Sequence, residues 1–318
     1  MRKVIEKIQN ARSVAIIPHI NEDADALGSC FAFASIMRRM GKEAVVYVSE
    51  VPEKRIEFIG EDYVIYNPEM VYSHDLCACI DCGDLKRIGD RVKLFNECEN
   101  TINIDHHFTN TNFAQANYVD AKAAAAGEIL CMLFKEMCVE ITNDEAASLF
   151  GAICSDTGSF KYSNVTPRTM RIAAELLEHD FDHADIARRL FDCESEKSAL
   201  MRAEVTQAIH SYLGGLIRVV TVGDDIYEKY DIAVKDAPNF VDIPRCIDGT
   251  EVAVCIKPQN GQIRVNLRSN NYFDVSETAV KFGGGGHVRA AGCNIDAKNL
   301  CEAEKMIVSA LEKDFKKY

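Results

Sequence analysis

Four short strand-like runs in this chain of 318 residues each end in a segment that contains aspartate. The densest is Asp105-His106-His107, which directly follows residues 101–104. The other three segments are 19–25, 81–84 and 155–158. An isolated pair of histidines is usually a surface feature, but open α/β sheets build their sites outside the carboxyl ends of their strands. Four such endings together favour an α/β fold with one divided metal site.

The first part of the chain alternates between strand-like and helix-like segments. Short runs suited to buried parallel strands occur at 13–18, 44–48, 76–80 and 101–104. Apolar residues at helical spacing predict a helix at 26–40, which Gly41 ends, and a helical stretch near 52–59. Strands that alternate with helices imply right-handed βαβ units, so we expect a mostly parallel sheet with flanking helices.

From residue 121 the pattern becomes helical. Helices are predicted at 121–138, from a cap at Asn143 to about 153, at 167–177, at 182–191 and over the long polar stretch 194–212. Gly214-Gly215 ends the last of these, and we place the domain linker there. The expected domains are a first domain at 1–190, a helical linker at 191–213 and a second domain at 214–318.

The second domain is expected to be a smaller α/β unit. Its predicted elements are a strand at 216–222, a hairpin of 251–257 and 262–268 around Asn260-Gly261, a helix from Asp274 or Ser276 to 282, a strand at 290–295 and a closing helix at 297–313.

A run of four glycines at 283–286 precedes His287. Glycines let backbone N–H groups approach an anion closely, and Arg268 on the preceding strand offers a two-pronged donor. A bare glycine run would be a flexible hairpin or a helix stop. The adjacent His287 and Arg289 favour an anion-binding site instead.

Composition limits the class of protein. Apolar residues make up 47% of the chain and charged residues 27%, so an ordinary buried core is expected. The charged, amphipathic start lacks the apolar centre of a signal peptide, and no apolar run is long enough to span a membrane. These features predict a cytoplasmic protein that does not bind membranes. The net charge of −13 argues against coating long nucleic acid, including duplexes, but allows a small phosphorylated ligand.

The 13 cysteines are expected to be reduced thiols, because most lie in apolar runs and no export signal accompanies them. Cys79 and Cys82 have a spacing typical of zinc sites. A partner pair is missing, and Cys77 and Cys79 alternate as in a strand, so zinc is the weaker interpretation.

Six side chains from the four segments are candidate metal ligands: His19, Asp23, Asp25, Asp81, His106 and Asp156. His19 and Asp23 can bind one cation while Asp25 faces a second, although Asp25 alone reads as a plain helix cap. Asp81 can bridge both cations. Mixed carboxylate and imidazole ligands suit manganese or magnesium, with iron or cobalt as alternatives. Two such ions about 3.5–4 Å apart hold and acidify a bridging water and stabilise the attacking and leaving oxygens at phosphorus.

The acidic segments resemble the four motifs of the DHH phosphoesterase superfamily. The matching residues are His19, Asp23, Asp25, Gly28, Ser29, Asp81, Asp105, His106, His107, Asp156, Thr157 and Gly158. The glycine run with His287, preceded by Arg268-Ser269, resembles the associated C-terminal domain of that superfamily, so the two matches cover nearly the whole chain. Length and the segment 156–164 are most similar to the bifunctional oligoribonucleases and 3′-phosphoadenosine 5′-phosphate (pAp) phosphatases, the nanoRNases.

The resemblance implies a role for each matched residue. One metal would lie on His19, Asp23 and Asp81, and a second on Asp25, Asp81, His106 and Asp156. His107 would touch the scissile phosphate and offset its developing charge, with Asp105 as the group that orients it. The terminal phosphate or nucleotide of the substrate would be held by Arg268, Ser269, Gly284, Gly285, Gly286 and His287.

The first motif departs from the pattern of the superfamily, which commonly reads Asn-Pro-Asp-Gly-Asp or similar. Glu22 replaces the proline and Ala24 replaces the glycine. No proposed ligand is lost. Glu22 is expected to add a negative charge beside the metals and so to alter metal preference or the access of substrate.

The resemblance implies a two-metal phosphoesterase, with Mn²⁺ preferred over Mg²⁺ or Co²⁺, that removes mononucleotides from very short RNA and converts pAp to AMP. A phosphodiesterase acting on cyclic di-AMP or pApA is the alternative, because the same two domains occur in such enzymes. An idle nucleotide-binding module would need degraded ligand positions, and none is degraded. The glycine run disfavours a pyrophosphatase, and the acidic charge disfavours a RecJ-type exonuclease. A homodimer is left open.

Overall fold

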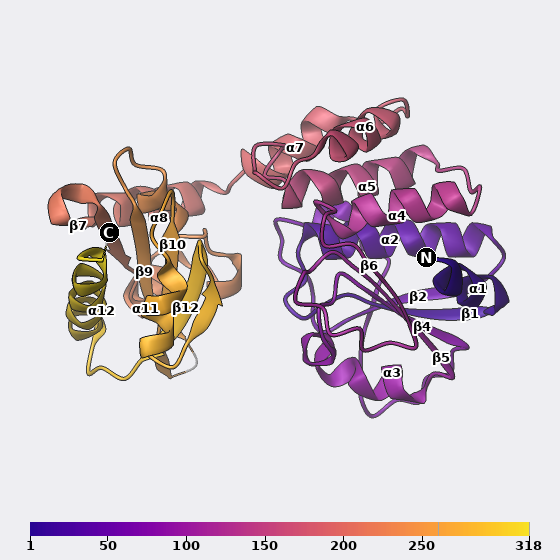
Figure 1. Ribbon diagram of the computed structural model, residues 1–318, viewed down its shortest axis with the longest axis horizontal. Helices are drawn as coiled ribbons and strands as arrows, with labels where there is room; N and C mark the ends of the chain where they lie inside the picture. Colours follow the sequence, from indigo (N-terminus) through magenta and orange to yellow (C-terminus); the bar gives the residue numbers. More distant parts are fainter. Residues whose placement is uncertain (260, 318) are drawn as a thin grey trace. The chain divides into compact units, whose positions relative to one another are not determined.

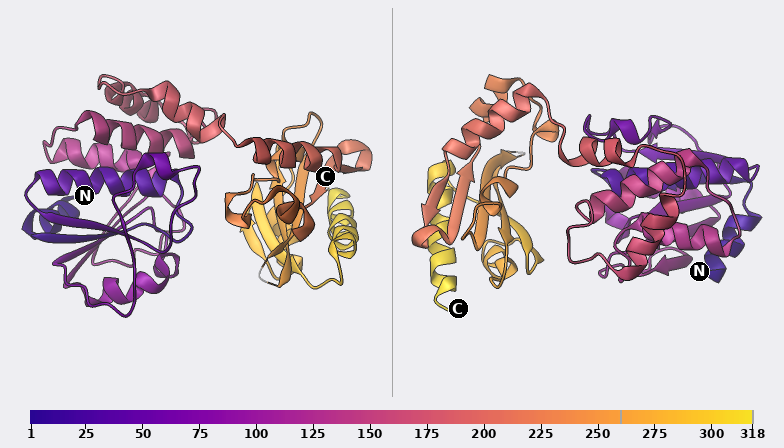
Figure 2. Two further views of the ribbon diagram at one scale, coloured as in Figure 1. Left: turned by 180° about the vertical axis from the view of Figure 1, so that it is seen from behind. Right: turned by 90° about the horizontal axis from the view of Figure 1, so that it is seen from above.

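A computed structural model of the protein describes residues 1–259 and 261–317. The chain forms two compact units, Met1–Cys193 and Glu194–Tyr318 (Figure 1). Each unit contains its own six-stranded sheet with helices, as predicted (Figure 2). The stretch 191–213, expected as a linker, contains helix α8 (Glu196–Gln207) and strand β7 (His210–Tyr212), both within the second unit. Among the described residues, no helix has both the length and the apolar character needed to cross a membrane.

The sheet of the first unit is parallel throughout, in the order β3-β2-β1-β4-β5-β6. Its strands are β1 (Ser13–Ile17), β2 (Glu43–Val48), β3 (Val64–Ile65), β4 (Leu76–Ile80), β5 (Asn100–Asp105) and β6 (Ala116–Val119). The chain adds strands on one side of β1 and then returns to add β4 on the other side. The winding therefore reverses between β1 and β4, and the carboxyl ends of strands at such a reversal are where open α/β sheets bind their ligands.

Both faces of this sheet are buried, which explains its continuous apolar strands. All five residues of β4 are buried. Ala78 and Ile80 belong to the core on one face of the sheet, whereas Cys77 and Cys79 belong to a separate core on the other face, beside Phe95. These cysteines are therefore small core residues, as the sequence predicted.

The helices of the first unit are α1 (Arg2–Asn10), α2 (Ala24–Arg39), α3 (Val92–Glu97), α4 (Ala126–Glu136), α5 (Asn143–Asp156), α6 (Pro167–Leu176) and α7 (His183–Phe191). Figure 1 shows α2, α4 and α5 over one face of the sheet and α3 under the opposite face. Gly28 allows α2 and α5 to pack closely, because a Cβ at this position would lie 2.6 Å from the carbonyl oxygen of Ser148.

Two predicted helix starts are wrong, and local hydrogen bonds explain both. The helix predicted at 121–138 begins only at Ala126, because the backbone turns after Asp120, whose carbonyl oxygen accepts a hydrogen bond from the Ala123 N–H. Helix α5 is capped by Thr142 rather than by Asn143. The Thr142 hydroxyl accepts the Glu145 N–H while the Glu145 carboxylate accepts the Thr142 N–H, which is a capping box.

Other differences concern short elements. The stretch 52–59 contains a single turn of 3-10 helix, Glu57–Ile59, instead of a longer helix. The helical stretch predicted at 194–212 ends at Gln207, after which β7 begins at His210. Strands β3 and β6 were not predicted. Both lie at the edges of the sheet and are at most four residues long, so they carry little periodic signal.

The second unit has a mixed sheet in the order β11-β12-β10-β9-β8-β7. Its further strands are β8 (Ile217–Thr221), β9 (Val252–Gln259), β10 (Gln262–Ser269), β11 (Gly285–His287) and β12 (Ala290–Ile295). The predicted hairpin is present as the antiparallel pair of β9 and β10, and its turn residue Asn260 lies outside the described residues. The glycine run is not a loop along its whole length, because Gly285 pairs with Gly292 in the edge strand β11.

Helices cover the two faces of this sheet unequally. Its helices are α8, α9 (Asp224–Tyr230), α10 (Asp242–Arg245), α11 (Val275–Lys281) and α12 (Leu300–Phe315). Residues of α11 and α12 share a core with Val265 and Leu267 of β10. On the opposite face, residues of α8 and α9 share a core with Val220 and Cys255 of β8 and β9. The described core on that face stops at β9, so β10, β12 and β11 are left without it.

A buried carboxylate, Glu251, organises the turn that follows β10. It is 2% exposed, and one of its oxygens accepts the backbone N–H groups of Asn271, Tyr272 and Phe273 at 3.2, 2.8 and 2.8 Å. Burial by itself raises the pKa of a carboxyl, but these donors hold the pKa of Glu251 below its ordinary value of 4.5. The charged form of Glu251 therefore stabilises the folded state.

We predict that Glu251→Gln lowers the free energy of unfolding by about 1–3 kcal/mol at pH 7, because the amide replaces a charged acceptor of several hydrogen bonds. A lowered folded-state pKa gives stability that is fully present above the unfolded-state value and is lost as the pH falls through the folded value. The difference between wild type and variant should therefore shrink below about pH 4.5. Urea unfolding at a series of pH values measures it. Glu277→Gln is the control, since Glu277 is exposed and pairs with the exposed Lys317. A difference that stays constant down to pH 3 would contradict this account.

Candidate metal centre

The predicted ligands of the first unit gather at the carboxyl ends of β1, β4 and β5. Because β1 and β4 are neighbours at the reversal of winding, segments far apart in the sequence meet there. The residues are His19 after β1, Asp23 and Asp25 at the start of α2, Asp81 after β4, Asp105 to His107 at the end of β5, and Asp156 at the end of α5.

The first group consists of His19, Asp23 and Asp81, whose ligand atoms lie within 4.8 Å of one another. The His19 Nε2 atom is 3.5 Å from an oxygen of Asp23 and 3.5 Å from Asp81 Oδ2. The other ring nitrogen, Nδ1, lies 2.7 Å from the carbonyl oxygen of Ile20. A carbonyl can only accept, so Nδ1 carries a proton, and Nε2 is the ring nitrogen that faces the carboxylates and is placed to bind a cation.

The second group consists of Asp25, His106 and Asp156, again with ligand atoms within 4.8 Å. The His106 Nε2 atom lies 3.3 Å from Asp156 Oδ2 and 3.9 Å from Asp25 Oδ2. It also lies 3.3 Å from Asp81 Oδ1. The two oxygens of Asp81 therefore face different groups, with Oδ2 toward His19 and Oδ1 toward His106.

Asp25 is not the cap of α2, which was the alternative interpretation. Asp23 is the cap, since one of its oxygens accepts the Ala26 N–H at 3.0 Å. The fully buried carboxylate of Asp25 instead accepts the N–H groups of Ala126 and Gly127 at 2.6 and 3.0 Å. It thereby occupies the amino end of α4, where a negative charge is favoured by the helix dipole.

The geometry around Asp81 fits a metal ion. Its Oδ1 atom is buried and has no hydrogen-bond partner in the described residues, which is costly for a carboxylate unless a cation completes its coordination. The backbone of Asp81 has a φ of +59°, an unfavourable conformation for a residue with a side chain. The positive φ and the oxygen without a hydrogen bond occur at one residue, between two groups of candidate ligands, which is the position predicted for a bridge between two cations.

The pKa values show how crowded the charges are. Burial by itself lowers the pKa of a histidine, but Asp23 and Asp81 raise the pKa of His19 to about 10. Burial and the charge of Asp81 raise the pKa of Asp25 to about 7. Burial, followed by the charges of neighbouring aspartates, also raises the pKa of Asp156 well above its ordinary value of 3.8. Without metal, carboxylates and imidazoles stabilise each other by sharing protons, and divalent cations would take over that role.

His107 differs from His106 in its surroundings. Its Nδ1 atom lies 2.7 Å from Asp105 Oδ1, while Asp105 is completely buried and the His107 side chain is 38% exposed. The hydrogen bond to Asp105 raises the pKa of His107. The buried carboxylate fixes the ring through Nδ1 and leaves Nε2 of an exposed imidazole available to a ligand.

Two asparagines that the sequence analysis missed hold Asp105 in place. The amide of Asn110 donates to Asp105 Oδ2 at 2.5 Å and to Asn103 Oδ1 at 2.8 Å. The Asn103 amide in turn donates to the carbonyl oxygen of Cys82 at 3.1 Å, in the turn that follows Asp81. This network links the ends of β4 and β5. Polar residues in turns are common, so nothing in the sequence distinguished these two.

A further group of missed residues fixes Asp156 against α4. The Asn164 amide donates to the carbonyl oxygens of Asp156 and Ala124 at 3.0 and 3.1 Å. Ala124 also donates its N–H to the buried Glu128, which binds the guanidinium of Arg168. These hydrogen bonds link the turn before α4 to the end of α5. Both segments lie at the second group of candidate ligands.

The negative charge that Glu22 was expected to add is paired with a buried arginine. The Glu22 carboxylate is buried and accepts hydrogen bonds from Ser49 N at 3.0 Å and from Arg91 NH1 at 3.2 Å. Arg91 is 1% exposed and also donates to the carbonyl oxygens of Ile88 and Tyr47. Glu22, which departs from the pattern of the superfamily, therefore forms a buried ion pair. This pair links the loop of residues 19–25 to the segment after β4.

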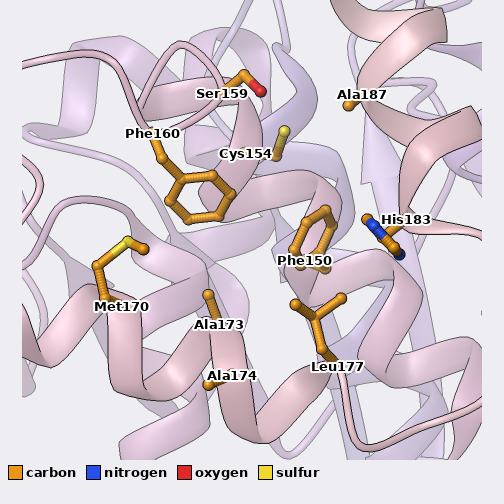
Figure 3. A pocket seen from close by; sticks show the side chains of 10 residues that line it. All are labelled: Phe150, Cys154, Ser159, Phe160, Met170, Ala173, Ala174, Leu177, His183 and Ala187. Atoms are coloured by element: carbon orange, nitrogen blue, oxygen red, sulfur yellow. The ribbon is translucent and has the colours of Figure 1, made fainter.

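An apolar pocket lies behind the loop that follows Asp156. It has a volume of about 300 Å³ and is formed by α5, α6, α7 and that loop (Figure 3). Figure 3 shows the rings of Phe150 and Phe160 with Met170 and Leu177, and the side chains of Ser159 and His183 beside them. The pocket contains no candidate metal ligand and no lysine or arginine, so it does not suit a phosphorylated substrate.

In the second unit, the register places Arg268 beside Ala290 of β12, which pairs in turn with His287 of β11. Directly paired residues point to the same face of a sheet, so Arg268 and His287 share a face. A Cβ at Gly284 would lie 2.2 Å from the carbonyl oxygen of Gly292, so only glycine fits there. Ser269 points to the opposite face, is 3% exposed, and donates to the Val288 carbonyl. The structure therefore brings together Arg268, His287 and Gly284 to Gly286, without Ser269.

We predict that Arg91→Met lowers the free energy of unfolding by about 3–5 kcal/mol, because it leaves the Glu22 carboxylate buried without its charged partner. The double variant Glu22→Gln/Arg91→Met should recover much of this loss, since it removes both charges. Urea unfolding measures all three proteins. Arg39→Met is the control, because Arg39 pairs with buried Glu145 but is itself 41% exposed. A double variant as unstable as the single one would show that the charge pair is not the cause.

Comparisons with known proteins agree with this architecture. Residues 13–153 match the N-terminal domain of the DHH family, and residues 207–313 match the DHHA1 domain. The bifunctional oligoribonuclease and PAP phosphatase NrnA of Thermus thermophilus is 29% identical over 317 residues, which are 99% of this chain and 94% of that protein. The protein of the same name from Bacillus subtilis is 25% identical over 296 residues, 92% of each chain.

Solved structures show the same fold. The crystal structure of an exopolyphosphatase-related protein from Bacteroides fragilis has a TM-score of 0.89 at 22% identity, covering 100% of this chain and 95% of that one. RecJ of Thermus thermophilus in complex with Mn²⁺ has a TM-score of 0.54 at 13% identity, covering 98% of this chain and 54% of that one. The two matches identify an N-terminal domain of the DHH family and a C-terminal DHHA1 domain in this chain.

Proposed function

We propose that the protein is a two-metal phosphoesterase that hydrolyses short oligoribonucleotides to mononucleotides and pAp to AMP. The observation that carries the proposal is the position of Asp81, which directs one oxygen to each of two ligand groups and has a buried oxygen that makes no hydrogen bond among the described residues. The names of the relatives from Thermus thermophilus and Bacillus subtilis supply the substrates.

In this proposal His19, Asp23 and Asp81 hold one divalent cation, and Asp25, Asp81, His106 and Asp156 hold the other. Bound cations of this kind supply an acidified water as nucleophile and neutralise charge at phosphorus. Manganese is our choice, because the ligands are oxygens and imidazoles without thiolates. The RecJ structure that shares the fold also holds Mn²⁺.

The proposed role of His107 follows from its own contacts. Asp105 holds the Nδ1 side of the ring and raises the pKa of His107, so the protonated imidazole is favoured. Its Nε2–H can then donate to a phosphate oxygen and stabilise the charge that develops there. Asp105 acts as the positioning residue, because it contacts the histidine and not the substrate.

For the second unit we propose that Arg268, His287 and the glycines 284–286 bind the terminal phosphate or nucleotide of the substrate, as the resemblance implied. The shared face of Arg268 and His287 supports this assignment. We assign the reaction to the cytoplasm, which fits the free state of all 13 cysteines. A homodimer stays a prediction.

We predict fast Mn²⁺-dependent turnover of pAp and of a 5′-phosphorylated RNA dinucleotide, with much slower turnover of a 24-nucleotide RNA. Asp81→Ala should abolish turnover, because it removes a ligand from both cations. His107→Ala should lower kcat by about 10²–10³-fold, the usual effect of losing one stabilising donor. The measurement is a time course with and without metal for each protein, and Lys305→Ala, an exposed position on α12, serves as the control.

The possible outcomes separate the hypotheses. Preference for cyclic di-AMP over pAp and the dinucleotide would favour the signalling-nucleotide alternative. Full activity of Asp81→Ala would remove the proposed metal centre from the mechanism. Absence of turnover on every substrate, with Mn²⁺ shown to bind, would leave the fold in place and refute the function.

We also predict that Arg268→Ala raises KM for pAp and the dinucleotide by about tenfold to a hundredfold, the effect of losing a charge-assisted hydrogen bond. Hydrolysis of bis(p-nitrophenyl) phosphate, which carries no terminal phosphate, should change much less. Steady-state kinetics on the three substrates tests this. Equal losses on all three would mean that Arg268 does more than grip the end of the substrate.

A further inference from the structure

Helices α8 and α9 cover only part of one face of the second sheet and leave β10, β12 and β11 uncovered there. This uncovered part carries a regular arrangement of polar side chains. Arg264, Asn266 and Arg268 alternate along β10, so all three point to this face. Each pairs with a residue of β12, respectively Asn294, Gly292 and Ala290. Four neighbouring positions thus form a square with Arg264 and Asn266 on one strand and Asn294 and Gly292 on the other.

The guanidinium of Arg264 fills the corner of this square that has no side chain. A Cβ on Gly292 would lie 2.5 Å from its NH2 atom and 3.0 Å from its Cζ atom. The Nε atom donates to Asn266 Oδ1 at 3.3 Å and NH1 donates to Asn294 Oδ1 at 3.4 Å. These two acceptors and the space above Gly292 hold the guanidinium beside β12.

No ion pair in the described part of the chain involves Arg264, although the chain has a net charge of −13. The nearest acceptors are two neutral amides, which leave the positive charge uncompensated. Arg264 is partly exposed. A guanidinium that is held beside a glycine by neutral amides and is partly exposed is suited to stacking with an aromatic ring.

We propose that Arg264 is a stacking platform for a nucleobase of the substrate. Arg264 and Arg268 are four residues apart on one strand, about 14 Å at roughly 3.4 Å per residue. Two arginine side chains at this separation span a mononucleotide, with the phosphate at Arg268 and the base over Arg264. Stacking accepts every base, because each has a π face, so the platform gives affinity for single-stranded nucleotides without choosing among sequences. This inference rests on the proposed function for the identity of the substrate.

The test is calorimetric binding of AMP, UMP and ribose 5-phosphate to the full-length protein, without turnover. Wild type should bind both nucleotides more tightly than ribose 5-phosphate. Arg264→Ala and Arg264→Lys should each weaken nucleotide binding by about tenfold, since lysine keeps the charge but has no plane. Neither change should alter the affinity for ribose 5-phosphate.

Gly292→Ala provides a second variant that keeps the arginine. Its new methyl group would displace the flexible end of Arg264, so nucleotide binding should weaken as in Arg264→Ala. Lys305→Ala on α12, which packs on the opposite face of the sheet, should bind like wild type. Far-UV circular dichroism and urea unfolding confirm that each variant is folded.

Three results would overturn the proposal: wild-type affinity in Arg264→Lys, an equal loss of ribose 5-phosphate binding in Arg264→Ala, or no preference of the wild type for AMP over ribose 5-phosphate. The first would indicate a charge contact and the second a phosphate contact. The proposed function can fail separately. Absence of hydrolysis with nucleotide binding that still depends on Arg264 would refute the phosphoesterase and retain the platform.

Discussion

The buried carboxylate of Asp81 is the constraint on which the first unit depends. It is 2% exposed, follows the central strand β4, and carries a positive φ, so both its charge and its backbone are unfavourable in isolation. The imidazoles of His19 and His106 approach its two oxygens from β1 and β5, the strands on either side of β4. The parallel order, which places β1 and β5 beside β4, delivers both imidazoles to this one carboxylate. The order of the strands therefore determines which side chains surround Asp81.

The gathering of the candidate metal ligands could be predicted from the sequence because their positions follow from a simple rule. Polar residues at the carboxyl ends of buried parallel strands meet, whatever their separation in sequence. Asn103 and Asn110 could not be predicted in this way. Asn103 lies inside β5 and reads as an interruption of an apolar run, yet its amide satisfies the carbonyl of Cys82 and supports Asn110. Their importance depends on a three-dimensional network of hydrogen bonds that no spacing rule encodes.

The second unit shows where a motif stops being informative. The glycine run and Arg268-Ser269 were predicted as one anion site, but adjacent residues of a strand point to opposite faces. Arg268 therefore shares its face with Arg264 and Asn266, whereas Ser269 lies on the other side of the sheet. A motif names residues that are close in sequence, and the pairing of β10 with β12 decides which of them act together. Arg264 was missed for this reason, since Gly292, the residue that makes room for it, is 28 positions away.

Glu22 stands where the motif of the superfamily commonly has a proline, and this difference changes how the loop of residues 19–25 is held in place. A proline restricts the chain locally, by fixing φ and by limiting the unfolded state. Glu22 instead restrains the loop through Arg91, and Ile20 adds a hydrogen bond from its N–H to the Arg87 carbonyl oxygen at 2.7 Å. Both partners belong to the segment after β4, which also supplies Asp81. The order of the loop that carries His19 and Asp23 thus depends on the same segment that supplies Asp81, so these three candidate ligands are coupled to one another through the protein.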